Sequence, residues 1–286
     1  MTSPTLQLRC GPGVLDLSQP IVMGILNVTP DSFSDGGQFI DVNSAVEHAL
    51  QMIADGAGMI DVGGESTRPG AADVSEAEEI RRVVPVIEAL SARTSVPISI
   101  DTSKAAVMTA AVAAGASLIN DVRALREPGA LEAAAKTDAA VCLMHMQGEP
   151  RTMQHEPRYG DVVAEVAAFL DERIAACEAA GIGRERLVLD PGIGFGKRLE
   201  HNLALLAHLP ELVRAQRPLL IGVSRKSMFQ ALLARSVEQR LAGGLAVATA
   251  AVLAGAAILR VHDVAETVDA VKVAVALRAA GYSSRR

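Results

Sequence analysis

The sequence has few cysteines and little that is typical of an exported protein. Its 286 residues include three cysteines, Cys10, Cys142 and Cys177, which lie far apart and lack the spacing of metal ligands. Cys142 and Cys177 fall in apolar or helical patterns, where cysteine usually acts as a small core residue, so we expect reduced thiols. The opening residues, MTSPTLQLRCGPG, lack the charged and apolar regions of a signal peptide. We therefore expect a cytoplasmic protein.

An excess of positive charge is also lacking. The formal net charge is −6 at pH 7, so we expect no nucleic-acid partner, although local basic sites remain open. No linker, low-complexity run or block of charge divides the chain, which predicts a single domain over residues 1–286. That length is usual for a closed α/β barrel.

One stretch, residues 241–259, is uncharged and long enough to suggest a membrane span. It consists mostly of alanine and glycine, which contribute little transfer free energy compared with leucine or isoleucine. It also divides into a small-residue helix and a short strand. We therefore predict a buried helix and strand, and no membrane partner.

Short apolar runs alternate with amphipathic, alanine-rich stretches, a pattern that predicts parallel strands joined by helices. A β-hairpin precedes them at residues 6–17, with Gly11, Pro12 and Gly13 as its turn. The eight runs are residues 21–27, 58–64, 96–101, 117–121, 140–145, 186–190, 219–224 and 257–262. Eight is the strand number of a TIM barrel, so the predicted fold is an α/β TIM (β/α)8 barrel with a short N-terminal hairpin.

Nearly every run ends on a polar residue. The terminal groups are Asn27, Asp61, Asp101, Asn120 with Asp121, His145, Asp190, Ser224 and His262. One or two such residues are explained as caps of the following helices. A whole ring of them predicts a functional site, because the carboxyl ends of barrel strands converge on one face.

Three residues of this ring suit a flat heterocycle. Asp101, Asn120 and Asp190 place carboxylates and an amide on rigid strands, where they can accept from adjacent N–H donors. Taken singly, each is equally well explained as a buried, hydrogen-bonded structural group.

Several cations follow the same strands. They are Arg68, Arg225, Lys226, Arg260 and His262. On a negatively charged chain they suggest an anion site, most simply for phosphate or pyrophosphate. Arg260 and His262 lie two residues apart, so in a strand they face the same side. For Arg225 we favour a surface ion pair.

The stretch DPGIGFGKR, residues 190–198, is rich in glycine. It matches neither the dinucleotide-binding fingerprint nor the Walker loop. It predicts only that the backbone comes close to another group there. Two further loops, residues 27–37 and 63–71, carry the glycine pairs 36–37 and 63–64 as possible hinges.

Eight motifs follow one another between residues 23 and 264. They are MGILNVTPDSFSDGG, DVGGESTRPGA, IDTSK, INDVRALREPGALEAAA, CLMHMQGEPRTMQ, LDPGIGFGK, SRKSMF and RVHDV. In this order they resemble the dihydropteroate synthases, a family of folate-pathway enzymes. The resemblance covers almost the full chain.

The resemblance implies a TIM barrel and a transferase reaction. Members join 4-aminobenzoate to 6-hydroxymethyl-7,8-dihydropterin pyrophosphate, releasing pyrophosphate and forming 7,8-dihydropteroate. Sulfonamides mimic aminobenzoate in this family. By the same resemblance the chain forms a homodimer, for which the small-residue segments 246–257 and 271–280 are suited; core packing explains those segments equally well.

The resemblance also implies the site residues. The residues matching the family's pterin site are Asp101, Asn120, Met144, Asp190, Phe195 and Lys226. The pyrophosphate cradle is matched by Asn27, Thr67, Arg68, Arg260 and His262, with Asn27 as ligand of a Mg2+ cofactor. The aminobenzoate site is matched by Phe33, Ser34, Pro69, Phe195, Lys226 and Ser227.

Catalysis is implied for Asp101, Lys226, Arg260 and His262, which would stabilise charge on the pterin and on the leaving pyrophosphate. The loops containing Phe33 and Pro69 are expected to close over the site. One position departs from the family: many relatives carry threonine after GFGK, where this chain has Arg198. Local packing of that loop is therefore not covered by the resemblance.

Two other functions remain as alternatives. A methyltransferase that moves a methyl group from methyltetrahydrofolate to a corrinoid protein could share Asp101, Asn120 and Asp190. It would have no use for a pyrophosphate cradle. A catalytically inactive pterin-binding subunit would be expected to have lost charged site residues, and here they are present.

Overall fold

Eight parallel strands form the centre of the molecule. The computed structural model describes residues 6–29, 41–66, 73–149, 152–213 and 217–282. The parallel strands are β3 (Ile21–Asn27), β4 (Met59–Gly63), β5 (Ile98–Asp101), β6 (Leu118–Asp121), β7 (Ala140–Met144), β8 (Leu187–Asp190), β9 (Leu220–Gly222) and β10 (Ile258–Val261). They pair in the order β8-β7-β6-β5-β4-β3-β10-β9, and a bridge between Leu189 and Leu219 joins the two ends. The predicted TIM barrel is confirmed, with a strand at each of the eight predicted runs.

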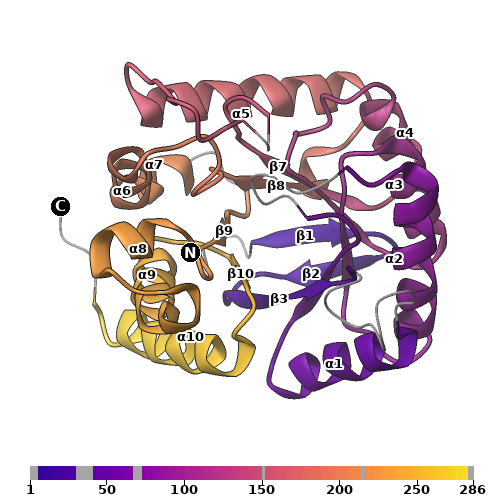
Figure 1. Cartoon of the computed structure of the whole chain (residues 1–286), viewed down its shortest axis with the longest axis horizontal. Coiled ribbons are helices and arrows are strands. Elements are labelled where there is room, and N and C mark those ends of the chain that lie inside the picture. Colours follow the sequence, from indigo (N-terminus) through magenta and orange to yellow (C-terminus); the bar gives the residue numbers. More distant parts are fainter. Residues whose placement is uncertain (1–5, 30–40, 67–72, 150–151, 214–216, 283–286) are drawn as a thin grey trace, which may run out of the picture.

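Helices surround the strands as an outer ring (Figure 1). They are α1 (Val42–Ala54), α2 (Glu76–Ser91), α3 (Ala105–Ala113), α4 (Ala130–Ala135), α5 (Val162–Ala179), α6 (Leu199–Ala207), α7 (Leu209–Val213), α8 (Met228–Leu233), α9 (Leu241–Leu253) and α10 (Val264–Ala279), with short 3-10 turns at Arg184–Arg186 and Val237–Gln239. Side-chain caps start several of them. Ser75 Oγ accepts from Glu78 N at 3.3 Å before α2, and Asp161 Oδ1 accepts from Val163 N at 3.0 Å before α5.

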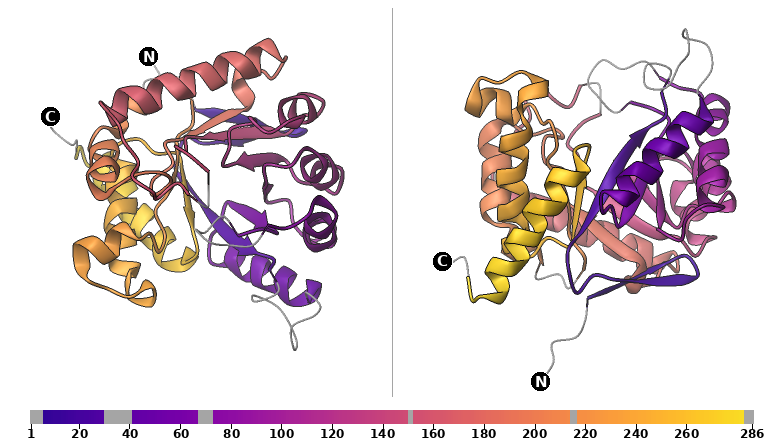
Figure 2. Two further views of the ribbon diagram at one scale, coloured as in Figure 1. Left: turned by 45° about the horizontal axis from the view of Figure 1, so that its top comes forward. Right: turned by 90° about the horizontal axis from the view of Figure 1, so that it is seen from below.

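The N-terminal hairpin closes the bottom of the barrel (Figure 2). Strands β1 (Gln7–Cys10) and β2 (Gly13–Asp16) pair antiparallel, so Gly13 belongs to the second strand and the turn itself is Gly11-Pro12. Leu8, Cys10 and Leu17 pack in one apolar cluster with side chains of the barrel strands. This seal leaves the opposite, carboxyl end of the strands as the open face.

Residues 241–259 are a helix and a strand, as predicted. They contain α9 and the start of β10. Within the described ranges, no helix is long and apolar enough to cross a membrane. The three cysteines are buried and not joined in disulfides.

Candidate functional site

A narrow slot opens at the carboxyl ends of the strands. Its walls are formed by Asp101, Asn120, Val122, Met144, Asp190, Ile193, Phe195, Gly222, Lys226 and Arg260. The strand register brings these residues together, because Asp101 pairs with Asn120 across β5 and β6, and Met144 pairs with Asp190 across β7 and β8. The slot therefore contains all six residues that the resemblance assigns to a pterin.

Arg260 enters the slot between two carboxylates. Its Nε lies 2.6 Å from Asp61 Oδ2, and its Nη2 lies 2.6 Å from Asp101 Oδ2. Asn120 Nδ2 donates to the same Asp61 oxygen at 3.1 Å. Asp61 is fully buried, so it acts as a fixed negative centre that orients one predicted pyrophosphate ligand and one predicted pterin ligand.

Burial and the charge of the ion-pair partner shift the pKa of Asp101 in opposite directions, and the same holds for Arg260. Burial raises the pKa of Asp101 to about 7; Arg260 opposes the rise, and the neighbouring Asp61 adds to it. Burial alone would lower the pKa of Arg260, but Asp61 and Asp101 outweigh it and raise that pKa. Arg260 is therefore always charged, whereas the charge of Asp101 depends on pH near neutrality.

On the opposite side of the slot, Asp190 faces Lys226. Burial raises the pKa of Asp190, which the hydrogen bond from Gly192 N at 2.7 Å and the charge of Lys226 oppose. Burial lowers the pKa of Lys226 to about 8, with Asp190 opposing the fall. The Lys226 ammonium lies 4.3 Å from the centre of the Phe195 ring. A carboxylate, an ammonium and an aromatic ring thus line one narrow space.

The glycines of the loop after β8 are required by close backbone contacts. Gly192 has φ +68°, and a side-chain carbon built on it would lie 1.9 Å from the His145 carbonyl oxygen. A carbon on Gly196 would lie 2.3 Å from the Gln147 carbonyl oxygen. The predicted close approach is therefore an approach to the loop after β7, and it brings Phe195 into the slot.

His262 and its neighbours lie at the ends of β9 and β10. His262 Nδ1 lies 3.0 Å from Ser224 Oγ, so the ring is held against the adjacent strand end. Arg225 pairs with Asp263 at 2.7 Å and is 43% exposed, which confirms the predicted surface ion pair. Ser227 is exposed just before α8.

Asn27 ends β3 beside the acidic side of the slot. A side-chain carbon built on Gly63 would lie 4.0 Å from Asn27 Oδ1 and 3.9 Å from Asp101 Oδ2. The two side chains therefore lie on either side of Gly63, each within ordinary contact distance of that position.

The other predicted ligands lie outside the described residues. These are Phe33, Ser34, Thr67, Arg68 and Pro69, together with most of the two loops expected to close. Arg198, the departure from the family pattern, is exposed at the start of α6, and its peptide N–H donates to His201 Nδ1 at 3.2 Å.

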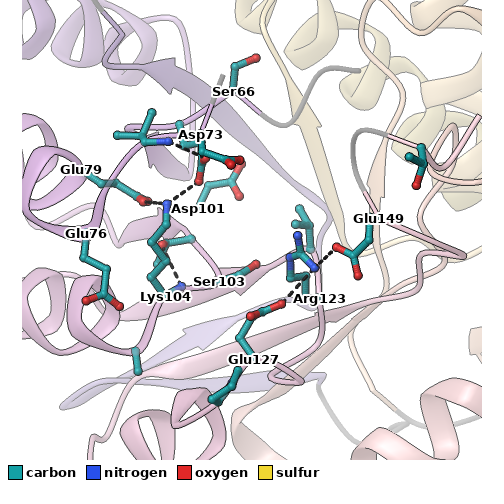
Figure 3. Close-up of a pocket in the computed structure, with 17 residues that line it drawn as sticks. Ser66, Asp73, Glu76, Glu79, Asp101, Ser103, Lys104, Arg123, Glu127 and Glu149 are labelled. Carbon is teal, nitrogen blue, oxygen red and sulfur yellow. Dashed lines mark hydrogen bonds and ion pairs between the residues drawn. The ribbon is translucent and has the colours of Figure 1, made fainter. Parts of the chain in front are cut away.

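A larger cavity of about 750 Å³ adjoins the slot (Figure 3). Most of the charged side chains that line it form ion pairs with each other. Lys104 Nζ lies 2.5 Å from both Glu65 and Glu79, and Arg123 pairs with Glu127 and Glu149. Among the described residues predicted for the site, only Asp101 borders this cavity. The geometry of the predicted pterin site belongs to the narrow slot.

Sequence reasoning gave no role to three buried groups. Asp61 and His145 appeared only as strand-end residues, and Lys197 appeared only as the end of a glycine-rich stretch. A charged residue inside the apolar strand MIDVG was a usable signal for Asp61, because a buried charge requires a partner. Lys197 and His145 carried no such signal, since each could equally be a surface residue.

Comparison with known proteins identifies the family of this chain. A family model described as pterin binding enzyme matches residues 23–262. The dihydropteroate synthase of Escherichia coli (strain K12) is 58% identical over 271 residues, which cover 95% of this chain and 96% of that one. The structure of the Yersinia pestis dihydropteroate synthase with a sulfonamide drug complex matches with a TM-score of 0.91 and 57% identity, over 96% of this chain and 99% of that one.

A third comparison includes the product. The dihydropteroate synthase of Burkholderia cenocepacia, complexed with 7,8-dihydropteroate, matches with a TM-score of 0.88 and 48% identity, over 98% of this chain and 99% of that one. Identity at this level extends along nearly the whole of each chain, and the solved relatives share the barrel. The chain belongs to the dihydropteroate synthase family of pterin-binding enzymes.

Proposed function

We propose that the slot binds 6-hydroxymethyl-7,8-dihydropterin pyrophosphate and that the protein transfers its pterin-methyl group to 4-aminobenzoate, forming 7,8-dihydropteroate and pyrophosphate. The observation that carries this proposal is the convergence of Asp101, Asn120, Asp190, Phe195 and Lys226 on one flat space. The product complex of the Burkholderia cenocepacia relative agrees with this reaction.

The slot matches the chemistry of a pterin. The 2-amino-4-oxo edge of the ring presents adjacent N–H donors to the Asp190 carboxylate, while the Asn120 amide, held by its bond to Asp61, faces the same space. Met144 and Phe195 supply apolar surface for the ring. Lys226, above Phe195, reaches the ring and the side from which aminobenzoate attacks.

Charge separates as the carbon–oxygen bond to pyrophosphate breaks. Arg260 stabilises the negative charge that grows on the leaving oxygens, and His262 extends the cationic side beyond the strand end. Ionised Asp101 offsets the positive charge that spreads into the pterin. Groups fixed in advance at sites of developing charge contribute on the order of 3 kcal/mol each.

Mg2+ fits the residues at the end of β3. Asn27 offers a carbonyl oxygen, the ligand type that Mg2+ prefers, beside the carboxylate of Asp101. The described residues contain no group of three or more His, Cys, Asp or Glu placed to hold a metal ion. Mg2+ commonly takes most of its ligands from substrate phosphates and water. When bound, Mg2+ neutralises charge on the pyrophosphate.

The aniline nitrogen of 4-aminobenzoate needs no strong base, since it is a free amine nucleophile. We assign its site to Phe195, Lys226 and Ser227, with Phe33, Ser34 and Pro69 supplied by the loops. The cation–π contact at 4.3 Å between Lys226 and the Phe195 ring supports this assignment. Orientation and electrostatics then carry the reaction.

We further propose a cytoplasmic homodimer. The apolar side chains exposed on the neighbouring helices α8, α9 and α10 and the turn between them support this: Leu232, Leu233, Val237, Leu241, Val273 and Leu277. Three buried, unpaired cysteines support a reducing compartment. Sedimentation equilibrium tests the dimer.

Pyrophosphate release tests the reaction. The purified protein is mixed with Mg2+, the pterin pyrophosphate and 4-aminobenzoate, with and without a chelator. We expect release that depends on both aminobenzoate and Mg2+ and that falls about 10²- to 10³-fold in Lys226→Ala and Arg260→Ala.

The matched controls are Lys272→Ala and Arg158→Ala, whose side chains are 72% and 82% exposed. Both should keep the original rate. If the protein binds the pterin but releases no pyrophosphate, the proposed reaction is contradicted, whereas the assignment of the fold is unaffected.

A further inference from the structure

A buried ammonium lies behind the slot and is given no role by the proposed reaction. Lys197, 3% exposed, follows the glycine-rich loop after β8. Its Nζ lies 2.9 Å from His145 Nδ1, 3.2 Å from the His145 carbonyl oxygen and 3.0 Å from the Phe195 carbonyl oxygen. Burial lowers the pKa of Lys197 to about 7, with the charge of Asp190 opposing the fall. In its charged form the group has three N–H donors, and three acceptors surround it.

His145 is built to accept from Lys197. Burial, followed by the charge of Lys197, lowers the pKa of His145 to about 3, so the imidazole is neutral. A neutral ring that accepts at Nδ1 carries its proton on Nε2. The ring packs edge-on against Phe169, with centres 4.9 Å apart, which holds its orientation.

The remaining polar groups of the loop are tied from other directions. Tyr159 Oη donates to the Gly196 carbonyl at 2.8 Å, and Asn202 Oδ1 accepts from Gly194 N at 2.7 Å. The Phe195 carbonyl is the point held by Lys197. Phe195 packs with Val122, Met144, Met146 and Met153, and the Lys226 ammonium lies 4.3 Å from the centre of its ring.

We propose that Lys197 is a positioning residue: through its bonds to His145 and to the Phe195 carbonyl it sets the angle of the Phe195 ring under Lys226, and so the width of the slot for the two substrates. The inference rests on the proposed function for the identity of those substrates. The placement of the ring itself does not depend on it.

Stability alone is a poor explanation for this lysine. Taking an ammonium out of water costs several kcal/mol, and well-packed apolar residues often replace buried charges without loss. Lys197→Met keeps the length of the stem and removes the three hydrogen bonds together with the charge, which also acts on His145 and Asp190. The backbone of the loop retains its ties to Tyr159 and Asn202.

Fluorine NMR reports on the ring directly. The chain has five phenylalanines, so 4-fluorophenylalanine labelling gives a simple spectrum in which Phe195→Leu identifies the Phe195 resonance. We expect this resonance to shift or broaden in Lys197→Met and to stay in place in Lys272→Met, a control on the outer helix α10. An unmoved Phe195 resonance overturns the inference.

Steady-state kinetics then link the ring to the substrates. The KM for aminobenzoate should rise on the order of tenfold in Lys197→Met, because small misplacements of a positioning group have large effects. Because Lys197 acts through Phe195, Lys197→Met with Phe195→Leu should have the KM of Phe195→Leu alone. Losses that multiply, or an unchanged KM, would contradict the role.

The two proposals fail separately. If the wild-type protein shows no aminobenzoate-dependent release of pyrophosphate, the proposed function is wrong. The fluorine spectrum still tests whether Lys197 sets the orientation of the Phe195 ring. If the wild type is active and the Phe195 resonance does not move in Lys197→Met, only the proposed role of Lys197 is wrong. If Lys197→Met does not fold, Lys197→Leu, which also lacks a donor, is measured against the same outcomes.

Discussion

Asp61→Asn is the substitution that best separates orientation from simple binding. Asp61 Oδ2 receives Arg260 Nε at 2.6 Å and Asn120 Nδ2 at 3.1 Å. The asparagine has the same shape and still offers one oxygen, but it has no charge. Its new amide nitrogen takes the place of an oxygen that has no hydrogen-bond partner among the described residues.

The magnitude follows from the contacts that lose their charge. A hydrogen bond to a charged group contributes about 1.5–3 kcal/mol, against about 0.5–1.5 kcal/mol for a neutral one. Arg260 keeps Asp101, so the complete loss of a buried pair, about 3–5 kcal/mol, is not reached. We expect about 2 kcal/mol, which lowers kcat/KM about 30-fold if the whole loss falls on the transition state.

The assay is aminobenzoate-dependent pyrophosphate release, with denaturant unfolding measured on the same samples. The matched control is Asp121→Asn. Asp121 is also fully buried, but it accepts from Arg123 N at 2.8 Å and Leu125 N at 2.7 Å, outside the slot. Both variants should be less stable, and only Asp61→Asn should lose much activity.

Wild-type kcat/KM in Asp61→Asn would refute the reasoning, because Arg260 would then be oriented without Asp61. Equal losses of activity in the two variants would also refute it, since destabilisation alone would explain both. A double variant with Arg260→Ala should be little worse than Arg260→Ala alone, because the two residues act as one unit.

Two further predictions concern pH and the loop after β8. Because burial raises the pKa of Asp101 to about 7, kcat/KM should fall as the pH drops below about 7. Asp61→Asn removes a like charge near Asp101, so the fall of kcat/KM should then begin at a lower pH. A pH profile of pyrophosphate release in both proteins checks these two predictions. The same raised pKa means that the contribution of Asp101 to stability is complete below its unfolded value of 3.8 and is lost as the pH rises through about 7. Gly192→Ala should destabilise the protein by about 2 kcal/mol or more, because φ of +68° is unfavourable for alanine and the new carbon would lie 1.9 Å from the His145 carbonyl oxygen. Gly222→Ala is the control, since a carbon built on Gly222 has no neighbour within 4 Å. An unchanged free energy of unfolding in Gly192→Ala would contradict the prediction.

Local sequence patterns were sufficient to predict the architecture and the side of the barrel that carries the site. Apolar runs such as residues 21–27 and 258–261 are buried strands because no other short element hides so continuous an apolar stretch. Polar residues at strand ends gather on one face, because parallel strands all point the same way. Asp101, Asn120 and Asp190 could therefore be placed together before any coordinates were known.

Tertiary structure alone decided how these groups pair. Asp61 and Arg260 are 199 residues apart, and Lys197 and His145 are 52 apart. Asp61 and Arg260 meet because β10 pairs with β3, next to β4, so that the last strand lies beside the first ones. Lys197 and His145 meet because β8 pairs with β7. A local pattern can show that a carboxylate such as Asp61 is buried, but the partner that makes its burial tolerable is determined by the tertiary structure.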